Sequence, residues 1–172
     1  YGSNKDKLIY VDGDSRKPVL PVPREIENVT FASYNVFARV SNDTILYLPA
    51  VEPRIYKCYG GQAEVLCELD FHYLWPDFSD VKKDNPLDLM RSIAEDGKIY
   101  STNMLSDGND VAVSFFCKDD FYVMKFRYND LSAHKLFKVD KNILESLGTL
   151  VSMKDGCLFF GEPGKLLKIR VD

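Results

Sequence analysis

The sequence predicts an all-β protein of antiparallel sheets, and three observations favour that class. The chain is rich in aromatic residues, with ten Tyr and eleven Phe in an aromatic fraction of 13%, and these side chains favour strands over helices. Short apolar or alternating runs recur between turn residues, which is typical of strands joined by tight turns. The densest such stretch lies at residues 42–71. A β-sandwich or a barrel is the alternative arrangement for the same strands.

The stretch at residues 42–71 predicts three consecutive strands. Pro49 and Pro53 mark the first connection as a loop, because proline lacks the N–H that a central strand needs. Gly60-Gly61 supplies the positive φ values that a two-residue hairpin turn requires. The strand-like runs are residues 45–48, 54–59 and 64–71.

A turn at Gly60-Gly61 also predicts which residues pair across the hairpin. It places Lys57 opposite Glu64 and Ile55 opposite Leu66. Apolar side chains then lie on both faces of the hairpin. We therefore expect the hairpin to lie between two packed layers rather than against water.

Further strand-like runs continue on both sides of this stretch. Residues 17–23 contain three prolines and are expected to form an edge segment or a loop. Residues 140–148 are expected to form a short capped helical turn. The other predicted strands are residues 7–11, 29–34, 36–40, 98–101, 111–116, 121–128, 136–139, 149–153, 157–160 and 166–171.

An insertion at residues 72–97 interrupts the strands and carries the best-marked helix, near residues 86–95. Asn85 is the expected N-cap, and Pro86 occupies the first helical position, where its missing N–H costs nothing. Gly97 is expected to end the helix in the left-handed conformation. The chain as a whole, residues 1–172, is read as one domain with this insertion.

A short phrase recurs along the chain: an Asp, then one residue, then one or two apolar residues, then an aromatic residue. It occurs at residues 6–10, 43–47, 96–100 and 155–159, and its aromatic residues are 37, 53 and 59 positions apart. A unit of about 40 residues with insertions is typical of a four-stranded propeller blade. The sequence therefore predicts propeller-like blades, about three in number.

The run Asn42–Tyr47, followed by Ile55–Lys57 and Glu68–Phe71, resembles bacterial six-bladed β-propeller proteins related to NHL-repeat propellers. The resemblance covers most of the chain from about residue 29. Such proteins are often exported and uncharacterised, which implies a location in the periplasm or at the cell surface and supplies no shared catalytic motif. Three to three and a half blades are too few for a six-bladed ring. Either the chain is a piece of a longer one, or copies associate to complete a ring, or the strands close differently.

Composition excludes several classes of partner. The net charge of −4 and a pI near 5.3 argue against a nucleic-acid or anionic-membrane surface. No apolar run approaches the roughly 20 residues that span a bilayer. Hydrophobic and charged fractions of 45% and 28% are those of an ordinary globular domain.

The sequence predicts no cofactor and no metal site. The four cysteines lack metal-ligand spacing and are expected to be buried free thiols, although disulfides are the alternative; they stand at positions 58, 67, 117 and 157. Lysines interrupt the aspartates of residues 77–88, which favours a solvated loop over a calcium site. Serine hydrolase, zincin and nucleotide-binding motifs are missing from the sequence.

The one stretch that suggests a ligand surface is His72–Phe78, which combines His72 with Tyr73, Trp75 and Phe78 in a loop. Exposed Trp and Tyr side chains stack well on sugars or on peptide partners. We therefore predict a binding or scaffolding module for a protein or carbohydrate ligand, with Trp75 as the stacking anchor. Alternatively, these side chains pack the insertion onto the sheets. The rival functions are a propeller-borne hydrolase or lyase completed outside this chain, and a purely structural interaction domain.

Overall fold

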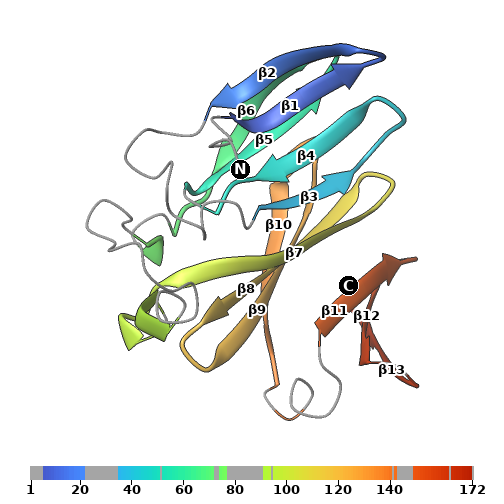
Figure 1. Cartoon of the computed structure of the whole chain (residues 1–172). Coiled ribbons are helices and arrows are strands. Elements are labelled where there is room, and N and C mark those ends of the chain that lie inside the picture. The colour runs from blue at the N-terminus through green and yellow to red at the C-terminus, as the bar shows by residue number, and fades with distance from the viewer. Residues whose placement is uncertain are drawn as a thin grey trace.

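Antiparallel sheets account for most of the described structure, as the sequence predicts (Figure 1). In the computed structural model the described residues are 6–21, 35–50, 52–71, 74–76, 91–93, 95–140, 142, 149–162 and 164–171. They contain thirteen strands in four sheets, and within each sheet every strand pairs with the strand next to it in the sequence. This simple up-and-down order is the order of strands in a propeller blade.

The four sheets follow one another along the chain. A two-stranded hairpin comes first, then two four-stranded sheets, called here the first and second sheets, and then a three-stranded third sheet. The hairpin is β1 (Asp6–Asp12) and β2 (Ser15–Pro21). The first sheet is β3 (Val36–Arg39), β4 (Thr44–Leu48), β5 (Arg54–Tyr59) and β6 (Gln62–Glu68). The second is β7 (Ile99–Asp107), β8 (Asp110–Cys117), β9 (Asp120–Arg127) and β10 (Asp130–Val139). The third is β11 (Thr149–Lys154), β12 (Cys157–Glu162) and β13 (Lys165–Arg170).

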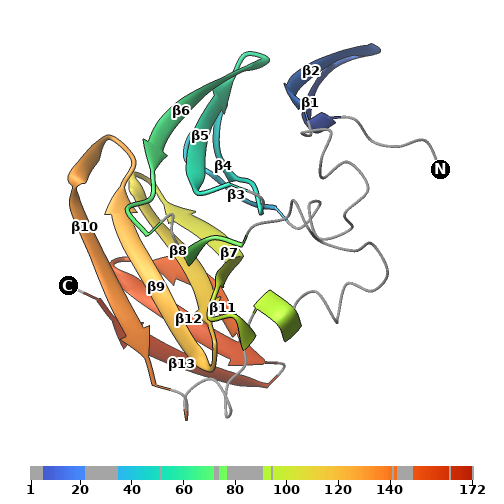
Figure 2. The ribbon, with the colours of Figure 1, turned by 90° about the vertical axis from the view of Figure 1, so that its left-hand side faces the viewer.

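The first strand of each larger sheet lies on the inside. Strand β7 contacts both β3 and β11, so these three inner strands run side by side (Figures 1 and 2). Strands β6 and β10 are the outer strands of their sheets. The sheets therefore pack face to face along their inner strands.

The pairing of β5 with β6 follows the predicted register only in part. Lys57 lies opposite Glu64, as expected, but Ile55 lies opposite Cys67 instead of Leu66. A β-bulge leaves Leu66 as an extra residue in β6, which shifts the register by one position. The expectation that both faces of the hairpin are covered is confirmed for β5, because Ile55 is buried on one face and Cys58 on the other.

The recurring phrase does not mark equivalent strands in every copy. Its copies at residues 43–47 and 155–159 enter the second strands of their sheets, β4 and β12. The copy at residues 96–100 enters β7, the first strand of the second sheet, so the alignment of this copy is wrong. Asp110, at the start of β8, holds the position equivalent to Asp43. Many strands begin with a turn residue followed by apolar residues. The phrase alone therefore does not show whether it begins the first or the second strand of a sheet.

Two strands are longer than the sequence predicts, and two predictions fall on residues that are not described. Strand β7 extends to Asp107 and β10 begins at Asp130. The predicted strand at 29–34 and the helix start at Asn85 lie outside the described residues. The predicted turn at 140–148 is described only at residues 140 and 142.

The end of the insertion helix matches the prediction. Residues 91–93 and 95 are helical, and Gly97 follows with φ of 69°. The Lys98 N–H donates to the Ile93 carbonyl at 2.9 Å, which is the bond that closes a Schellman cap. Gly97 therefore ends the helix because only a residue without Cβ adopts this conformation without strain.

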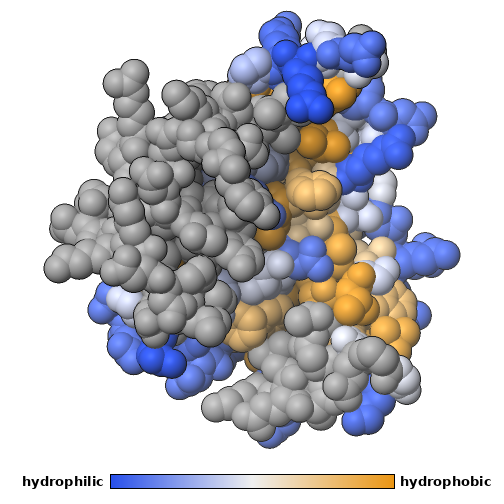
Figure 3. Space-filling view, in the orientation of Figure 1, coloured by the Kyte–Doolittle hydropathy of each residue, from blue (hydrophilic) through white to orange (hydrophobic). Residues whose placement is uncertain are grey.

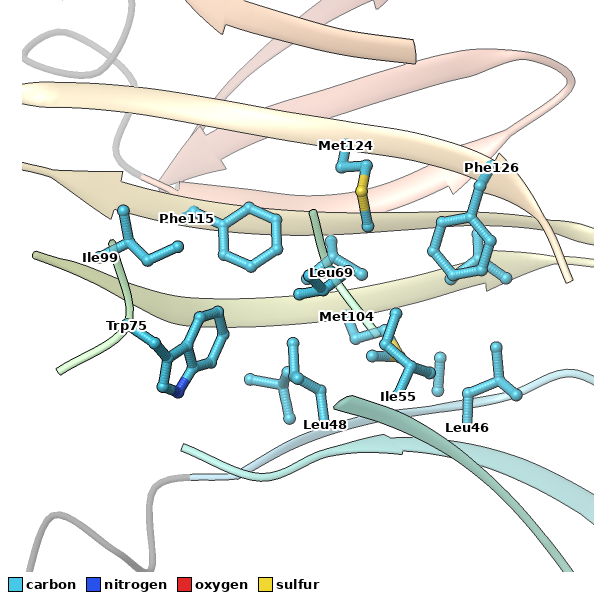
Figure 4. Close-up of a cluster of buried hydrophobic side chains, with 14 residues drawn as sticks. Leu46, Leu48, Ile55, Leu69, Trp75, Ile99, Met104, Phe115, Met124 and Phe126 are labelled. Carbon is cyan, nitrogen blue, oxygen red and sulfur yellow. The ribbon is translucent and has the colours of Figure 1, made fainter. Parts of the chain in front are cut away.

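Two apolar clusters hold the larger sheets together. The first-interface cluster lies between the first and second sheets and includes Leu48, Phe115 and Met124 (Figure 4). The second-interface cluster lies between the second and third sheets and is built around Phe121 and Phe160. Each fully buried large side chain contributes about 1.5–3 kcal/mol. The four cysteines are free thiols, as predicted; Cys58 and Cys157 are also buried as expected, whereas Cys67 and Cys117 are only half-buried.

Candidate functional site: a groove between the first and second sheets

The predicted stacking anchor, Trp75, belongs to the core instead. Its side chain is only 6% exposed, and its Nε1–H donates to the Ala50 carbonyl at 2.9 Å. Its ring meets Phe115 edge to face, with centroids 6.4 Å apart, inside the first-interface cluster (Figure 4). The prediction of an exposed Trp75 is therefore wrong, and the alternative, in which it packs the insertion onto the sheets, is the observed one. The other predicted site residues, His72, Tyr73 and Phe78, lie outside the described residues.

A concave groove lies beside this core. It consists of two adjoining hollows with volumes of about 290 and 360 Å³. The two hollows share Phe71 and Leu136, so these two side chains form the wall between them. The first hollow is further lined by Cys67, Glu68, Leu69, Asp70, Met124, Phe126, Leu131 and His134. The second is further lined by Leu74, Ile99, Phe115, Cys117 and Tyr122.

The segment after β6 forms one side of the groove. Leu69 is buried in the first-interface cluster, and its N–H donates to the Pro53 carbonyl at 2.8 Å. With Leu69 fixed inward, its neighbours Glu68 and Asp70 remain exposed at the rim. Figure 2 shows this segment crossing from β6 toward the second sheet. The rim carboxylates are thus held by one buried leucine and one backbone hydrogen bond.

Phe71 continues the same segment and becomes the dividing wall. Its ring meets Phe115 edge to face, with centroids 5.4 Å apart and planes at 81°. The Leu74 N–H donates to the Phe71 carbonyl at 2.9 Å, which turns the chain back over the second hollow. Edge-to-face aromatic contacts add about 0.5–1.5 kcal/mol beyond burial. The wall is therefore rigidly placed.

The opposite side of the groove comes from an irregular part of β10. Asp130 lies opposite Arg127, but the next paired residue is Lys135, opposite Lys125. The residues between leave the ladder, and Asp130 accepts hydrogen bonds from the Ser132 N–H and hydroxyl, at 3.3 and 2.6 Å. Asp and Ser are residues that favour such local turns. The bulge carries Leu131 and His134 to the first hollow.

The charges along the groove are unevenly distributed. Glu68 pairs with Arg54 at 3.3 Å, whereas Asp70 has no hydrogen bond or ion pair within the described structure. No Lys or Arg is among the described lining residues of either hollow. Burial raises the pKa of the Cys67 thiol, and the charge of Asp70 acts in the same direction. The first hollow therefore has an apolar floor and a negative rim.

The second hollow has an almost entirely apolar lining. Its polar group is the Tyr122 hydroxyl, which donates to Asp120 Oδ2 at 3.3 Å. Burial and the Asp120 charge raise the pKa of Tyr122. The tyrosine therefore presents its neutral ring to the hollow, with its hydroxyl held by Asp120.

Sequence comparison agrees with this architecture. Residues 4–148 match a family described as a six-bladed β-propeller. The chain belongs to that family. No match was found among curated proteins or among solved structures.

In this propeller the groove lies between two neighbouring blades, and the inner strand β7 reaches it at Ile99. A second apolar surface lies over those inner strands, where hydrophobic residues gather in Figure 3. Phe37 on β3 and Val151 on β11 are exposed apolar residues of these inner strands. The groove is the better candidate site because it combines a concave apolar lining with carboxylates at its rim.

The described residues show neither a metal centre nor a membrane helix. Among them, no group of three or more His, Cys, Asp or Glu side chains is placed to hold a metal ion. The same residues include no helix long and apolar enough to cross a membrane. His134 lies with Nδ1 at 3.2 Å from the Leu131 carbonyl.

Sequence reasoning missed the groove residues. The usable signals are the Asp-x-Ser turn at residues 130–132 and the rim carboxylates on either side of the apolar Leu69. Neither signal shows that residues 67–71 and 131–136 come together.

Proposed function

We propose that this propeller is a non-enzymatic binding module and that the groove is its ligand surface. The observation that carries the proposal is the pair of adjoining hollows, about 290 and 360 Å³, with apolar linings and carboxylates at one rim. Ligand sites are typically concave and mostly apolar, carry a few polar groups, and have volumes of roughly 300–1,000 Å³. The two hollows together fall within that range.

The alternative is a propeller-borne hydrolase or lyase whose site is completed elsewhere. A catalytic nucleophile needs an adjacent base or a lowered pKa. In the groove, burial raises the pKa of the Cys67 thiol, and the His134 Nδ1 faces a backbone carbonyl. These features support binding in preference to catalysis at this site.

Methyl NMR tests the proposal directly. Met124 lines the first hollow, whereas Met104 and Met153 are buried elsewhere in the two clusters and serve as internal references. Titration with a panel of short peptides and monosaccharides is expected to shift the Met124 methyl signal and leave the two references in place. If no member of either class moves Met124 selectively, the groove is not a ligand site, and the purely structural interaction domain becomes the better description.

A matched pair of leucines provides the variant control. Leu136, in the wall of the groove, and Leu166, on β13, are both exposed, at 55% and 64%. Leu136→Ala should weaken the binding of any ligand that shifts Met124, and Leu166→Ala should leave it unchanged. Equal effects of both substitutions would mean that the ligand adheres nonspecifically to exposed apolar side chains.

A further inference from the structure

The groove combines a negative rim with an apolar second hollow, and this combination specifies a class of ligand. We propose that it takes an extended peptide segment with an apolar side chain and a lysine or arginine at alternate positions. The inference rests on the proposed function and adds to it the chemistry of the ligand.

The charges at the rim of the first hollow predict a positively charged group in the ligand. Asp70 is exposed at the rim without a partner in the described structure, and Glu68 beside it is held by Arg54. On β9 and β10, Lys125 and Lys135 lie opposite each other in the strand ladder, and neither lines the groove. The Lys125 ammonium is engaged elsewhere, donating to the Val171 carbonyl and pairing with Asp110. A ligand cation over the first hollow therefore meets a carboxylate and no lysine or arginine among the described lining residues.

The apolar lining of the second hollow predicts an apolar side chain in the ligand. Its described lining is apolar or aromatic apart from the tied Tyr122 hydroxyl and the Cys117 thiol. A sugar, which needs several hydrogen-bond partners, finds few there. An aromatic or branched aliphatic side chain fits this lining, because burying its surface is worth about 25 cal/mol per Å².

The arrangement of the two hollows and of the strands beside them favours an extended peptide as the ligand. Alternate side chains of an extended chain point to the same face, and here the two hollows adjoin across one wall, Phe71 and Leu136. Strand β10 pairs only with β9 among the described strands. Its outer edge therefore offers backbone groups, which is how peptides commonly add to a sheet.

Three blocked tripeptides isolate each part of the inference: Ac-Phe-Thr-Lys-NH₂, its norleucine analogue and its glutamate analogue. All three offer the same aromatic group, and only the side chain at the third position changes, from cationic to neutral to anionic. The affinity, measured from the Met124 methyl shift during titration, should be highest for the lysine peptide and lowest for the glutamate peptide. An exposed charge pair predicts a preference of lysine over norleucine of roughly two- to fivefold at low salt, shrinking as salt is added.

A charge-matched variant pair identifies the carboxylate. Asp70→Asn should abolish the preference for lysine over norleucine, while leaving the affinity for the norleucine peptide unchanged. Asp14→Asn, in the exposed turn between β1 and β2, removes the same charge away from the groove and should preserve the preference. Because Asp70 is exposed, the substitution leaves the core intact, and circular dichroism verifies that it does.

The outcomes separate this inference from the proposed function. Equal affinity for the lysine and norleucine peptides overturns the role of charge but leaves the groove as a ligand site. Phenethylamine binding as tightly as the lysine peptide overturns the peptide backbone in favour of a small amine. A Met124 shift with monosaccharides alone rejects the peptide inference and retains the binding module. A lysine preference that survives Asp70→Asn assigns the charge recognition to another residue and overturns the proposal.

Discussion

The two interfaces between blades differ in how they are closed. The second interface is filled by a run of aromatic rings, with Phe116 and Phe121 at 4.9 Å and Phe121 and Phe160 at 6.2 Å between centroids. The first interface also has a dense cluster near Trp75 and Phe115, but beside it lies the groove. The second sheet thus meets the three-stranded third sheet through an aromatic contact and the four-stranded first sheet through a contact that leaves a groove.

The hydrogen bonds that join neighbouring sheets also differ between the two interfaces. At the second interface, Asn103 Nδ2 on β7 donates to the Leu150 carbonyl at 2.9 Å, and Lys125 on β9 donates to the Val171 carbonyl at 3.2 Å. At the first interface, the tie between strands is on the inner side, where the Ser106 hydroxyl donates to the Arg39 carbonyl. The ties of the second interface therefore reach further out, to β9. At the first interface, the groove lies between the two sheets.

The largest expected effect tests whether the second interface is the better filled. Phe160 is fully buried at its centre, so Phe160→Ala should cost about 3–5 kcal/mol. Phe71, half-buried in the groove wall, should cost about 1–2 kcal/mol when replaced by Ala, because part of its surface is already hydrated. Urea denaturation followed by circular dichroism measures both. Equal costs would remove the distinction between the interfaces.

Trp75 tests the dense part of the first interface. Trp75→Phe keeps an aromatic ring but removes the N–H that donates to the Ala50 carbonyl, in a buried setting. Leaving that carbonyl without a donor should cost about 1–3 kcal/mol. The wild-type emission should be blue-shifted and protected from iodide, since Trp75 is the chain's single tryptophan. Emission typical of water-exposed indole would contradict the buried position.

Cys58 extends the comparison to the face of the first sheet that points away from the groove. Burial raises the pKa of this thiol from 9.0 to about 11. A raised folded-state pKa gives stability that is fully present below pH 9 and is lost as the pH rises toward 11. The loss should be on the order of 1–2 kcal/mol, and Cys58→Ala should remove it from the alkaline stability profile. Tyr47 and Tyr56 pack in the same cluster and also have raised pKa values through burial, so part of the alkaline slope should persist. An identical profile in the variant would place the titration elsewhere.

Local chemistry made most of the fold predictable from the sequence. Gly60-Gly61 and Gly97 were predicted as turn and cap because few other residues adopt positive φ, and both have it. Alternating runs located the strands for a similar reason, since a half-buried strand needs apolar residues at every second position. The bulges in β6 and β10 were not predictable, because one extra residue in a ladder leaves no compositional mark.

The candidate site is formed by contacts between segments that are distant in the sequence. For that reason, the site predicted from the sequence was wrong at Trp75. Trp75 sits among proline and acidic residues, which suggests exposure, yet its indole finds a carbonyl 25 residues earlier in the chain. Asp70 and Leu136 line the same hollow across 66 positions of sequence. Motif reading ranks individual residues and cannot show such proximity. The groove became visible only once the sheets were placed together.

The smallest expected effect is the most informative about the groove, and it comes from one strand. On β10, Val139 is 8% exposed in the second-interface cluster, whereas Leu136 is 55% exposed in the groove wall. Val139→Ala should cost about 2 kcal/mol, since buried methyl groups are lost and a cavity remains. Leu136→Ala should change the free energy of unfolding by about 0.5 kcal/mol or less, as surface substitutions do.

The denaturation midpoints of Val139→Ala and Leu136→Ala, measured side by side, show whether Leu136 contributes to packing or to ligand binding. A negligible stability effect combined with weaker peptide binding means that this leucine contributes to recognition and not to packing. A cost as large as that of Val139→Ala would mean that the groove closes around Leu136 in solution. The wall would then be part of the first-interface core, and reduced binding by the variant would report a disturbed fold instead of a lost contact.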